Sequence, residues 1–260
     1  MKRRAILIFN DGGPSNYLPG VTVDKANYLN FLKSPEGGAW ENPEIKVYDN
    51  NCSKELLLAY INAFRLTEHT GYWLIIFSGH GYVNSQNQTM LELSPGKDCS
   101  VDDIKKATAY ARSLLIADSC RVVIHTITDS LKRERKLFSD TSASCTYRLR
   151  CKTLYMNQLE KVYPDSFCVA YAAEYNQCAN DDDATGGYYS SALLKAADDI
   201  IKACKASYRH DDFVATFEKM HEIAKQAVIT KSSGTQMPTT EGHLLNTFPF
   251  VVVPRSLNYV

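Results

Sequence analysis

The sequence has no excess of charge of either sign and no hydrophobic run long enough to cross a membrane. Among its 260 residues, 29 Lys and Arg balance 29 Asp and Glu, so the formal net charge is zero. Without a net field, binding to nucleic acid or to an anionic membrane surface is not expected. The longest apolar runs, 5–9, 73–77 and 114–117, fall far short of the roughly 20 residues that a transmembrane helix needs.

A signal peptide, a zinc motif and a phosphate-binding loop are also missing. The first residues lack the long apolar stretch and small-residue cleavage site of a signal peptide, which predicts a cytoplasmic protein. The eight cysteines include no Cys-x-x-Cys pair and no histidine at zinc-ligand spacing. We therefore expect free thiols, no metal and no cofactor. No strand precedes a Gly-x-Gly-x-x-Gly loop, which argues against a flavodoxin-like ligand-binding domain.

Strand-like apolar runs alternate with helical periodicity along most of the chain, a pattern typical of an α/β fold. The runs 72–77 and 114–117 are almost continuously apolar, as expected for strands covered on both faces. A length of 260 residues suits one domain with a central, mostly parallel sheet and helices on both faces. The predicted strands are 5–9, 45–48, 72–77, 114–117, 167–173 and 248–253, and the predicted helices are 23–31, 53–64, 103–112, 191–204 and 212–228.

A histidine and a cysteine follow the two most apolar predicted strands. His80 lies in the segment Ser-Gly-His-Gly at 78–81, and Cys120 ends the segment Asp-Ser-Cys at 118–120. Ligands bind outside the carboxyl ends of strands in open α/β sheets, so both side chains are expected where such sheets do chemistry. A thiolate attacks a carbonyl, and a nearby histidine can accept the thiol proton and deliver it to the leaving amine. The alternative is an accidental pair of inert residues, since the chain holds eight cysteines and six histidines.

These two segments resemble the His-Gly and Asp-x-Cys blocks of the caspase-like cysteine peptidases, the peptidase C14 type, and those of metacaspases and orthocaspase-like proteins most closely. The resemblance extends over nearly the whole chain. It implies a caspase-like three-layer sandwich in a single peptidase domain, 1–260, with a large-subunit-like part at about 1–128, a linker-like excursion at 129–166 and a small-subunit-like part at 167–260. Three further blocks match in order: Leu18-Pro19-Gly20 with Asp24, Gly186-Gly187-Tyr188-Tyr189, and Gln236-Met237-Pro238 with Phe248-Pro249-Phe250.

The resemblance implies a cysteine endopeptidase that acts on protein substrates, in a cell-death or defence pathway. Cys120 would be the nucleophile and His80 its proton-transfer partner. The backbone N–H groups of Gly81 and Cys120 would hold the oxyanion, and a side chain at Gly81 would crowd the scissile carbonyl. A tight turn after the strand is the alternative reason for the glycines at 79 and 81. The sequence leaves the oligomeric state open.

The resemblance also implies a specificity pocket formed by Asp24, Ser78 and Asp118. Two carboxylates at its floor would stabilise a buried Arg or Lys side chain and leave an acidic or apolar one poorly compensated. We therefore expect a substrate with a basic residue, Arg or Lys, before the scissile bond. The alternatives are a helix-capping or first-turn carboxylate for Asp24 and a strand-end turn residue for Asp118.

The residues after the nucleophile depart from the family. Many metacaspases continue with His-Ser-Gly, whereas this chain has Arg121-Val122-Val123. The departure keeps open a second hypothesis, a catalytically inactive caspase-like scaffold or binding module. Calcium-activated metacaspases carry a Val-Asp-Asp stretch like 101–103. The other aspartates of that set have no counterpart here. Two roles therefore stay open for Asp102 and Asp103, helix capping and calcium activation.

Two charged segments each permit two interpretations. The basic run 132–136 is either a solvated surface segment or a self-cleavage site between the subunit-like parts, since its Lys and Arg residues match the expected specificity. The acidic run 181–183 is either solvated or attracts a basic substrate.

Overall fold

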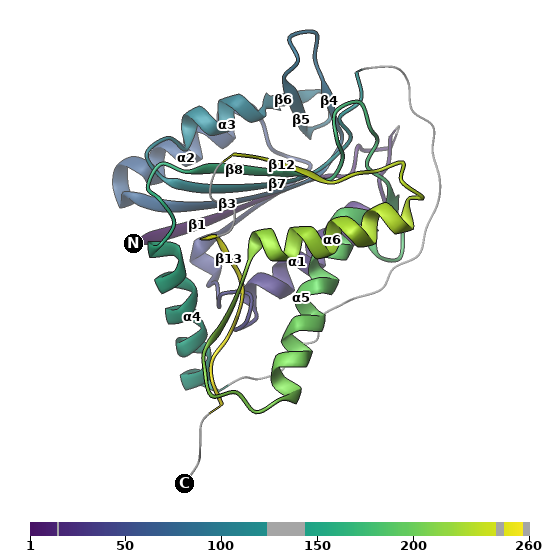
Figure 1. Ribbon diagram of the computed structural model, residues 1–260. Helices are drawn as coiled ribbons and strands as arrows, with labels where there is room; N and C mark the ends of the chain where they lie inside the picture. The colour runs from purple at the N-terminus through teal and green to yellow at the C-terminus, as the bar shows by residue number, and fades with distance from the viewer. Residues whose placement is uncertain (15, 124–143, 243–246, 257–260) are drawn as a thin grey trace.

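The computed structural model describes residues 1–14, 16–123, 144–242 and 247–256, and Figure 1 shows their arrangement. A six-stranded sheet runs through the centre in the order β12, β8, β7, β3, β1, β2. The strands β8, β7, β3, β1 and β2 are parallel, and β12 pairs antiparallel with β8. The bounds are β1 Lys2–Asn10, β2 Ile45–Asp49, β3 Thr70–Gly79, β7 Arg112–Asp118, β8 Phe167–Tyr171 and β12 Thr239–Gly242.

Helices cover both faces of this sheet because side chains of the central strands alternate between two apolar faces. On one face, Leu74 and Ile76 of β3 pack with residues of α1, α4, α5 and α6. On the other face, Ile75 and Phe77 pack with residues of α2 and α3. The three layers, visible in Figure 1, confirm the predicted α/β sandwich with helices on both faces of a mostly parallel sheet. The helices are α1 (Gly20–Lys33), α2 (Lys54–Glu68), α3 (Val101–Ala107), α4 (Cys145–Glu160), α5 (Tyr188–Ala206) and α6 (Phe217–Lys231).

Three predicted elements differ from the observed ones. The helix predicted at 212–228 begins only at Phe217, because Phe213–Thr216 forms strand β11. The apolar run at the C-terminus is strand β13, Pro249–Val253, yet it pairs with β11 outside the central sheet. Burial among α4, α5 and α6 makes this strand apolar on both sides, as a central strand would be. The helix predicted at 103–112 ends at Ala107.

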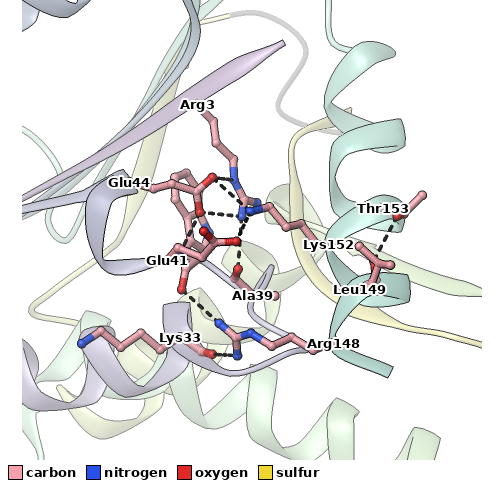
Figure 2. A network of polar contacts seen from close by, with 10 residues as sticks. Arg3, Lys33, Ala39, Glu41, Glu44, Arg148, Leu149, Lys152 and Thr153 are labelled. Carbon is pink, nitrogen blue, oxygen red and sulfur yellow. Dashed lines mark hydrogen bonds and ion pairs between the residues drawn. The ribbon is translucent and has the colours of Figure 1, made fainter. Parts of the chain in front are cut away.

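Helix α4 is held against the start of the chain by charged groups, shown in Figure 2. The buried guanidinium of Arg3 donates to both carboxylate oxygens of Glu44 at 3.0 and 3.1 Å. Lys152 of α4 pairs with Glu41 at 2.6 Å and with Glu44 at 3.5 Å. Bidentate pairs of this kind fix geometry as well as adding energy. The second half of the predicted excursion 129–166 is therefore a helix docked on the first part of the chain.

The remaining sequence predictions concern the basic segment, the subunit-like parts, the cysteines and membrane-spanning helices. The predicted basic segment 132–136 lies outside the described residues, and the division into subunit-like parts stays a prediction. No disulfide joins the eight cysteines, all of which lie in the described residues, and five of them, including Cys168 in β8, are buried. No helix in the described part of the chain is long and apolar enough to traverse a bilayer.

Candidate active site

Two neighbouring central strands bring His80 and Cys120 to the same edge of the sheet. The strands β3 and β7 are parallel, with Ser78 opposite Asp118, so the residues that follow them emerge side by side. His80 stands between β3 and strand β4, Gly81–Val83, and Cys120 follows β7 by two residues. Both side chains line one cavity of about 660 Å³. The structure thus places the two residues in one cleft, as the protease hypothesis requires.

The imidazole of His80 is oriented by a backbone carbonyl. Its Nε2 lies 2.7 Å from the carbonyl oxygen of Asn16. A carbonyl can only accept, so Nε2 carries the proton and Nδ1 is the basic nitrogen. Gly12 leaves room for this contact, since a Cβ there would lie 2.4 Å from Nε2 of His80 and 2.0 Å from the Asn16 oxygen. The sequence analysis missed both residues; the Gly-Gly pair at 12–13 was the available signal.

The thiol of Cys120 is protonated in this arrangement and is not activated for attack. It donates to the carbonyl of Ala179 at 3.5 Å, and Cys178 lines the same cavity. Burial, followed by the neighbouring Cys178, raises the pKa of Cys120 to about 12. The sulfur is therefore protonated at neutral pH, and a protonated thiol is a poor nucleophile. No hydrogen bond joins it to His80 in the described part of the chain.

Gly81 is the point where the histidine and cysteine segments meet. A Cβ at Gly81 would lie 2.6 Å from the Ser119 hydroxyl and 3.0 Å from the Cys120 carbonyl oxygen. Contacts under 3.0 Å force a neighbour to move. The expected reason for this glycine was crowding of the scissile carbonyl, and the structure supplies a second reason, the close approach of the Ser119 side chain and the Cys120 carbonyl. The oxyanion role of its N–H stays a prediction.

The three residues predicted to form the specificity pocket lie together in the same cavity. The Asp24 carboxylate accepts hydrogen bonds from the Ser78 hydroxyl at 2.7 Å and from the Gly187 N–H at 3.1 Å. The Asp118 carboxylate accepts from the N–H of Ser190 at 2.9 Å. Asp24 is the fifth residue of α1, outside its first turn, so the helix-capping alternative is wrong. Asp118 binds the first turn of α5 instead of a turn of its own.

Burial works against ionisation of both carboxyl groups. It raises the pKa of Asp24 well above its usual value, and the charge of Asp118 raises it further. Burial likewise raises the pKa of Asp118 to about 6, although the Ser190 contacts favour the charged form. The N-terminus of α5 offsets part of the cost, because its N–H groups and dipole favour negative charge. Ionisation of both carboxyl groups is therefore unfavourable unless a cation lies between them.

Two glycines close the pocket with backbone alone. Gly186 has a φ of +91°, and a Cβ there would lie 2.1 Å from an oxygen of Asp24. A Cβ at Gly187 would lie 2.3 Å from an oxygen of Asp118. Any side chain at either position would displace a carboxylate. This close approach explains the Gly-Gly block that precedes α5.

Comparison with protein-family models matches the caspase domain over residues 2–249. The chain belongs to the caspase family. Its fold is also similar to the crystal structure of caspase-1 from Spodoptera frugiperda, with a TM-score of 0.56 and 14% sequence identity over 92% of this chain and 86% of that chain. At that identity the likeness supports the shared fold alone. No curated protein matches the sequence.

Arg121 explains how this caspase-family domain accommodates the residues that depart from the metacaspase pattern. Its buried guanidinium stacks on the ring of Tyr171, with the carbon 3.8 Å from the ring centroid. It donates to Thr89 at 3.2 Å and to Glu241 at 3.2 Å. These partners belong to strands β8, β5 (Thr89–Ser94) and β12. Arg121 therefore ties the nucleophile segment to three strands, a structural role that says nothing against catalysis.

The cavity of this caspase-family domain is acidic throughout. Asp181, in the acidic run 181–183, lies at its exposed edge and accepts from the N–H of Gly20 at 3.3 Å. Partial desolvation raises the pKa of Asp181, and the nearby His80 opposes that rise. Among its described lining residues are five carboxylates and no Lys or Arg. The sequence analysis placed Asp181 in a loop of uncertain role and did not include it in the site.

Asp102 and Asp103 both accept hydrogen bonds from other side chains of the protein. The Asp103 carboxylate accepts from the Ser100 hydroxyl and from Lys54, each at 2.7 Å. Asp102 accepts from Gln88 at 3.2 Å. Ser100 caps α3 by accepting from the Asp103 N–H. The part of the chain that the structure describes holds no cluster of three or more His, Cys, Asp or Glu able to bind a metal. Calcium activation stays an untested prediction.

Proposed function

We propose that this caspase-family protein is a cysteine endopeptidase that cleaves its substrates after Arg or Lys. The observation that carries the proposal is the position of two buried carboxylates, Asp24 and Asp118, in the same cavity as a thiol and an imidazole, with no cationic partner among the described residues.

The carboxylate pair supports the basic specificity on energetic grounds. A buried charge is costly unless it is paired, and the pKa values of Asp24 and Asp118 are raised accordingly. A guanidinium or ammonium between them would let both ionise and would supply the missing partner. An acidic substrate side chain would instead add a third negative group. Asp181 adds a further carboxylate at the edge of the cavity and favours the same cation.

The reaction follows from the tautomer of His80. Nε2 donates to the Asn16 carbonyl, so Nδ1 takes the proton from the Cys120 thiol as sulfur attacks the scissile carbonyl carbon. The N–H groups of Gly81 and Cys120 stabilise the oxyanion. His80 then gives the proton to the leaving amine, and a thioester remains on Cys120. Water, deprotonated by His80, hydrolyses the thioester and restores the thiol.

Substrate binding must also turn the sulfur toward the imidazole. At rest the thiol faces Cys178 and Ala179. A peptide chain in the cavity would compete for these positions, since Ala179 and Asn180 line it together with His80. Apo geometries of this kind are common, because catalytic hydrogen bonds often tighten only in the substrate complex.

Cleavage profiling of the purified protein tests the proposal. A peptide library should yield cleavage after Arg and Lys with wild type and none with Cys120→Ala or His80→Ala. Cys145→Ser, which removes an exposed thiol elsewhere, should behave as wild type. Cleavage that persists in Cys120→Ala would rule out this nucleophile.

The second candidate is a catalytically inactive scaffold. The protonated thiol, and the lack of a hydrogen bond between it and His80 in the described part of the chain, are the observations that favour it. A folded wild-type protein that binds basic peptides without cleaving them would establish this alternative. A role in cell death or defence and a cytoplasmic location stay predictions.

A further inference from the structure

A second cysteine lies against the candidate nucleophile. Cys178 is exposed and lines the same cavity as Cys120, whose thiol donates to the carbonyl of Ala179, the residue after Cys178. The remaining six cysteines line no part of this cavity.

Backbone hydrogen bonds fix the two cysteine segments side by side. The N–H of Arg121 donates to the carbonyl of Gln177 at 2.9 Å, and the N–H of Asn176 donates to the carbonyl of Arg121 at 2.9 Å. The Cys120 thiol donates to the carbonyl next to Cys178, that of Ala179, at 3.5 Å. The fold therefore holds the two cysteine segments next to each other.

Side-chain contacts hold the Cys178 segment from the other side. The Gln177 amide oxygen accepts from the N–H of Met237 at 2.7 Å. The amide oxygen of Gln236, a fully buried residue, accepts from the N–H of Asn180 at 2.9 Å. The Cys178 segment is therefore held beside the Cys120 segment by hydrogen bonds to residues on both of its sides.

We propose that Cys178 is a redox-modification site, which forms a reversible disulfide with Cys120 when the protein meets a hydroperoxide. The exposed Cys178 sulfur attacks the peroxide, the O–O bond breaks, and a sulfenic acid and an alcohol or water form. The Cys120 sulfur then attacks the sulfenic sulfur, and the hydroxide that leaves takes the thiol proton as water. Two thiols lose two electrons in all, and the peroxide gains them. A dithiol reverses the bond by exchange.

The disulfide would occupy the sulfur that the proposed function needs, so its effect on turnover rests on that proposal. The bond itself does not. A protein without peptidase activity could still form it, which allows the two ideas to be tested apart.

The test uses hydrogen peroxide on the purified protein, followed by N-ethylmaleimide, non-reducing digestion and mass spectrometry. We expect a crosslinked peptide pair containing Cys120 and Cys178. Turnover should fall in proportion to the crosslinked fraction and return with dithiothreitol. Cys145→Ser, which lacks another exposed thiol, should crosslink as wild type does.

Cys178→Ser should form no crosslink and should lose much less turnover than wild type at the peroxide dose that crosslinks wild type. Two results would overturn the inference. One is the absence of the 120–178 pair in wild type at peroxide doses that modify Cys145. The other is a Cys178→Ser variant that loses and regains turnover as wild type does. If reduced wild type cleaves nothing while the crosslink forms, the proposed function fails and this inference stands.

Discussion

The carboxylate side of the cavity and its thiol side differ in how completely they are assembled. Asp24 and Asp118 are buried and already hold their backbone donors on α5. His80 and Cys120 each face a backbone carbonyl, and the thiol is protonated. In a cavity built in this way, substrate binding precedes the reaction. The carboxylates need only a cation to complete their site, whereas the nucleophile still has to lose a proton.

The largest expected effect separates recognition from fold. Asp118→Asn removes one of two buried charges while keeping an oxygen to accept from Ser190. We expect kcat/KM for Arg substrates to fall about a hundredfold, equivalent to about 3 kcal/mol. Asp182→Asn is the matched control, since the Asp182 carboxylate accepts from the N–H groups of its own turn, Ala184 and Thr185, and is not among the described residues that line the cavity. An equal loss in both variants would contradict the pocket.

A second variant acts on the imidazole and leaves the carboxylates alone. Gly12→Ala places a methyl group 2.0 Å from the Asn16 oxygen and should displace His80. We expect kcat to fall roughly tenfold to a hundredfold, with KM for Arg substrates little changed. Gly13→Ala is the control, because its φ of +65° carries similar backbone strain but its nearest contact is 3.7 Å away. Equal losses would show that strain, and not the imidazole contact, matters.

The third prediction concerns pH. Burial raises the pKa of Asp118 to about 6, so the free enzyme loses this charge as pH falls through that value. We expect kcat/KM for Arg substrates to fall about tenfold per pH unit below pH 6. The steady-state profile of Asp118→Asn should lack the contribution of this group. An unchanged acidic limb in that variant would assign the limb to another group.

The smallest expected effect is on stability. The pKa of Asp118 is higher in the folded chain than the ordinary value of 3.8, so ionisation disfavours the fold. The penalty is absent below pH 3.8, grows as pH rises to about 6 and is complete above it. We expect Asp118→Asn to raise the free energy of unfolding by roughly 1 to 3 kcal/mol at pH 7.5. Urea unfolding should show no such gain at pH 4.

The strands that frame this site were more predictable from the sequence than the individual contacts within it. The strands before His80 and Cys120 were predictable because both are apolar on two faces, and their parallel pairing then fixed Ser78 opposite Asp118. The Asn16 contact was not predictable, because every residue type has a backbone carbonyl. Arg121 appeared only as a departure from the metacaspase pattern, because the residues that it contacts, Tyr171 and Glu241, are distant in sequence.

The edge of the sheet illustrates the same limit in the fold. The apolar run at 249–253 looks like a central strand, whereas the observed edge strand β12 reads Thr-Thr-Glu-Gly. Periodicity reports burial on a face, and it does not distinguish burial by a sheet from burial by helices.

The ion pairs that anchor α4 to Glu41 and Glu44 bear on what a break in the backbone would do. If the chain were cut anywhere between 124 and 143, the fragment that begins with α4 would keep its strand β8 in the sheet. Its Lys152 would stay paired with Glu41 of the other fragment. Such a molecule should elute from a sizing column as one particle and separate into two bands only in detergent.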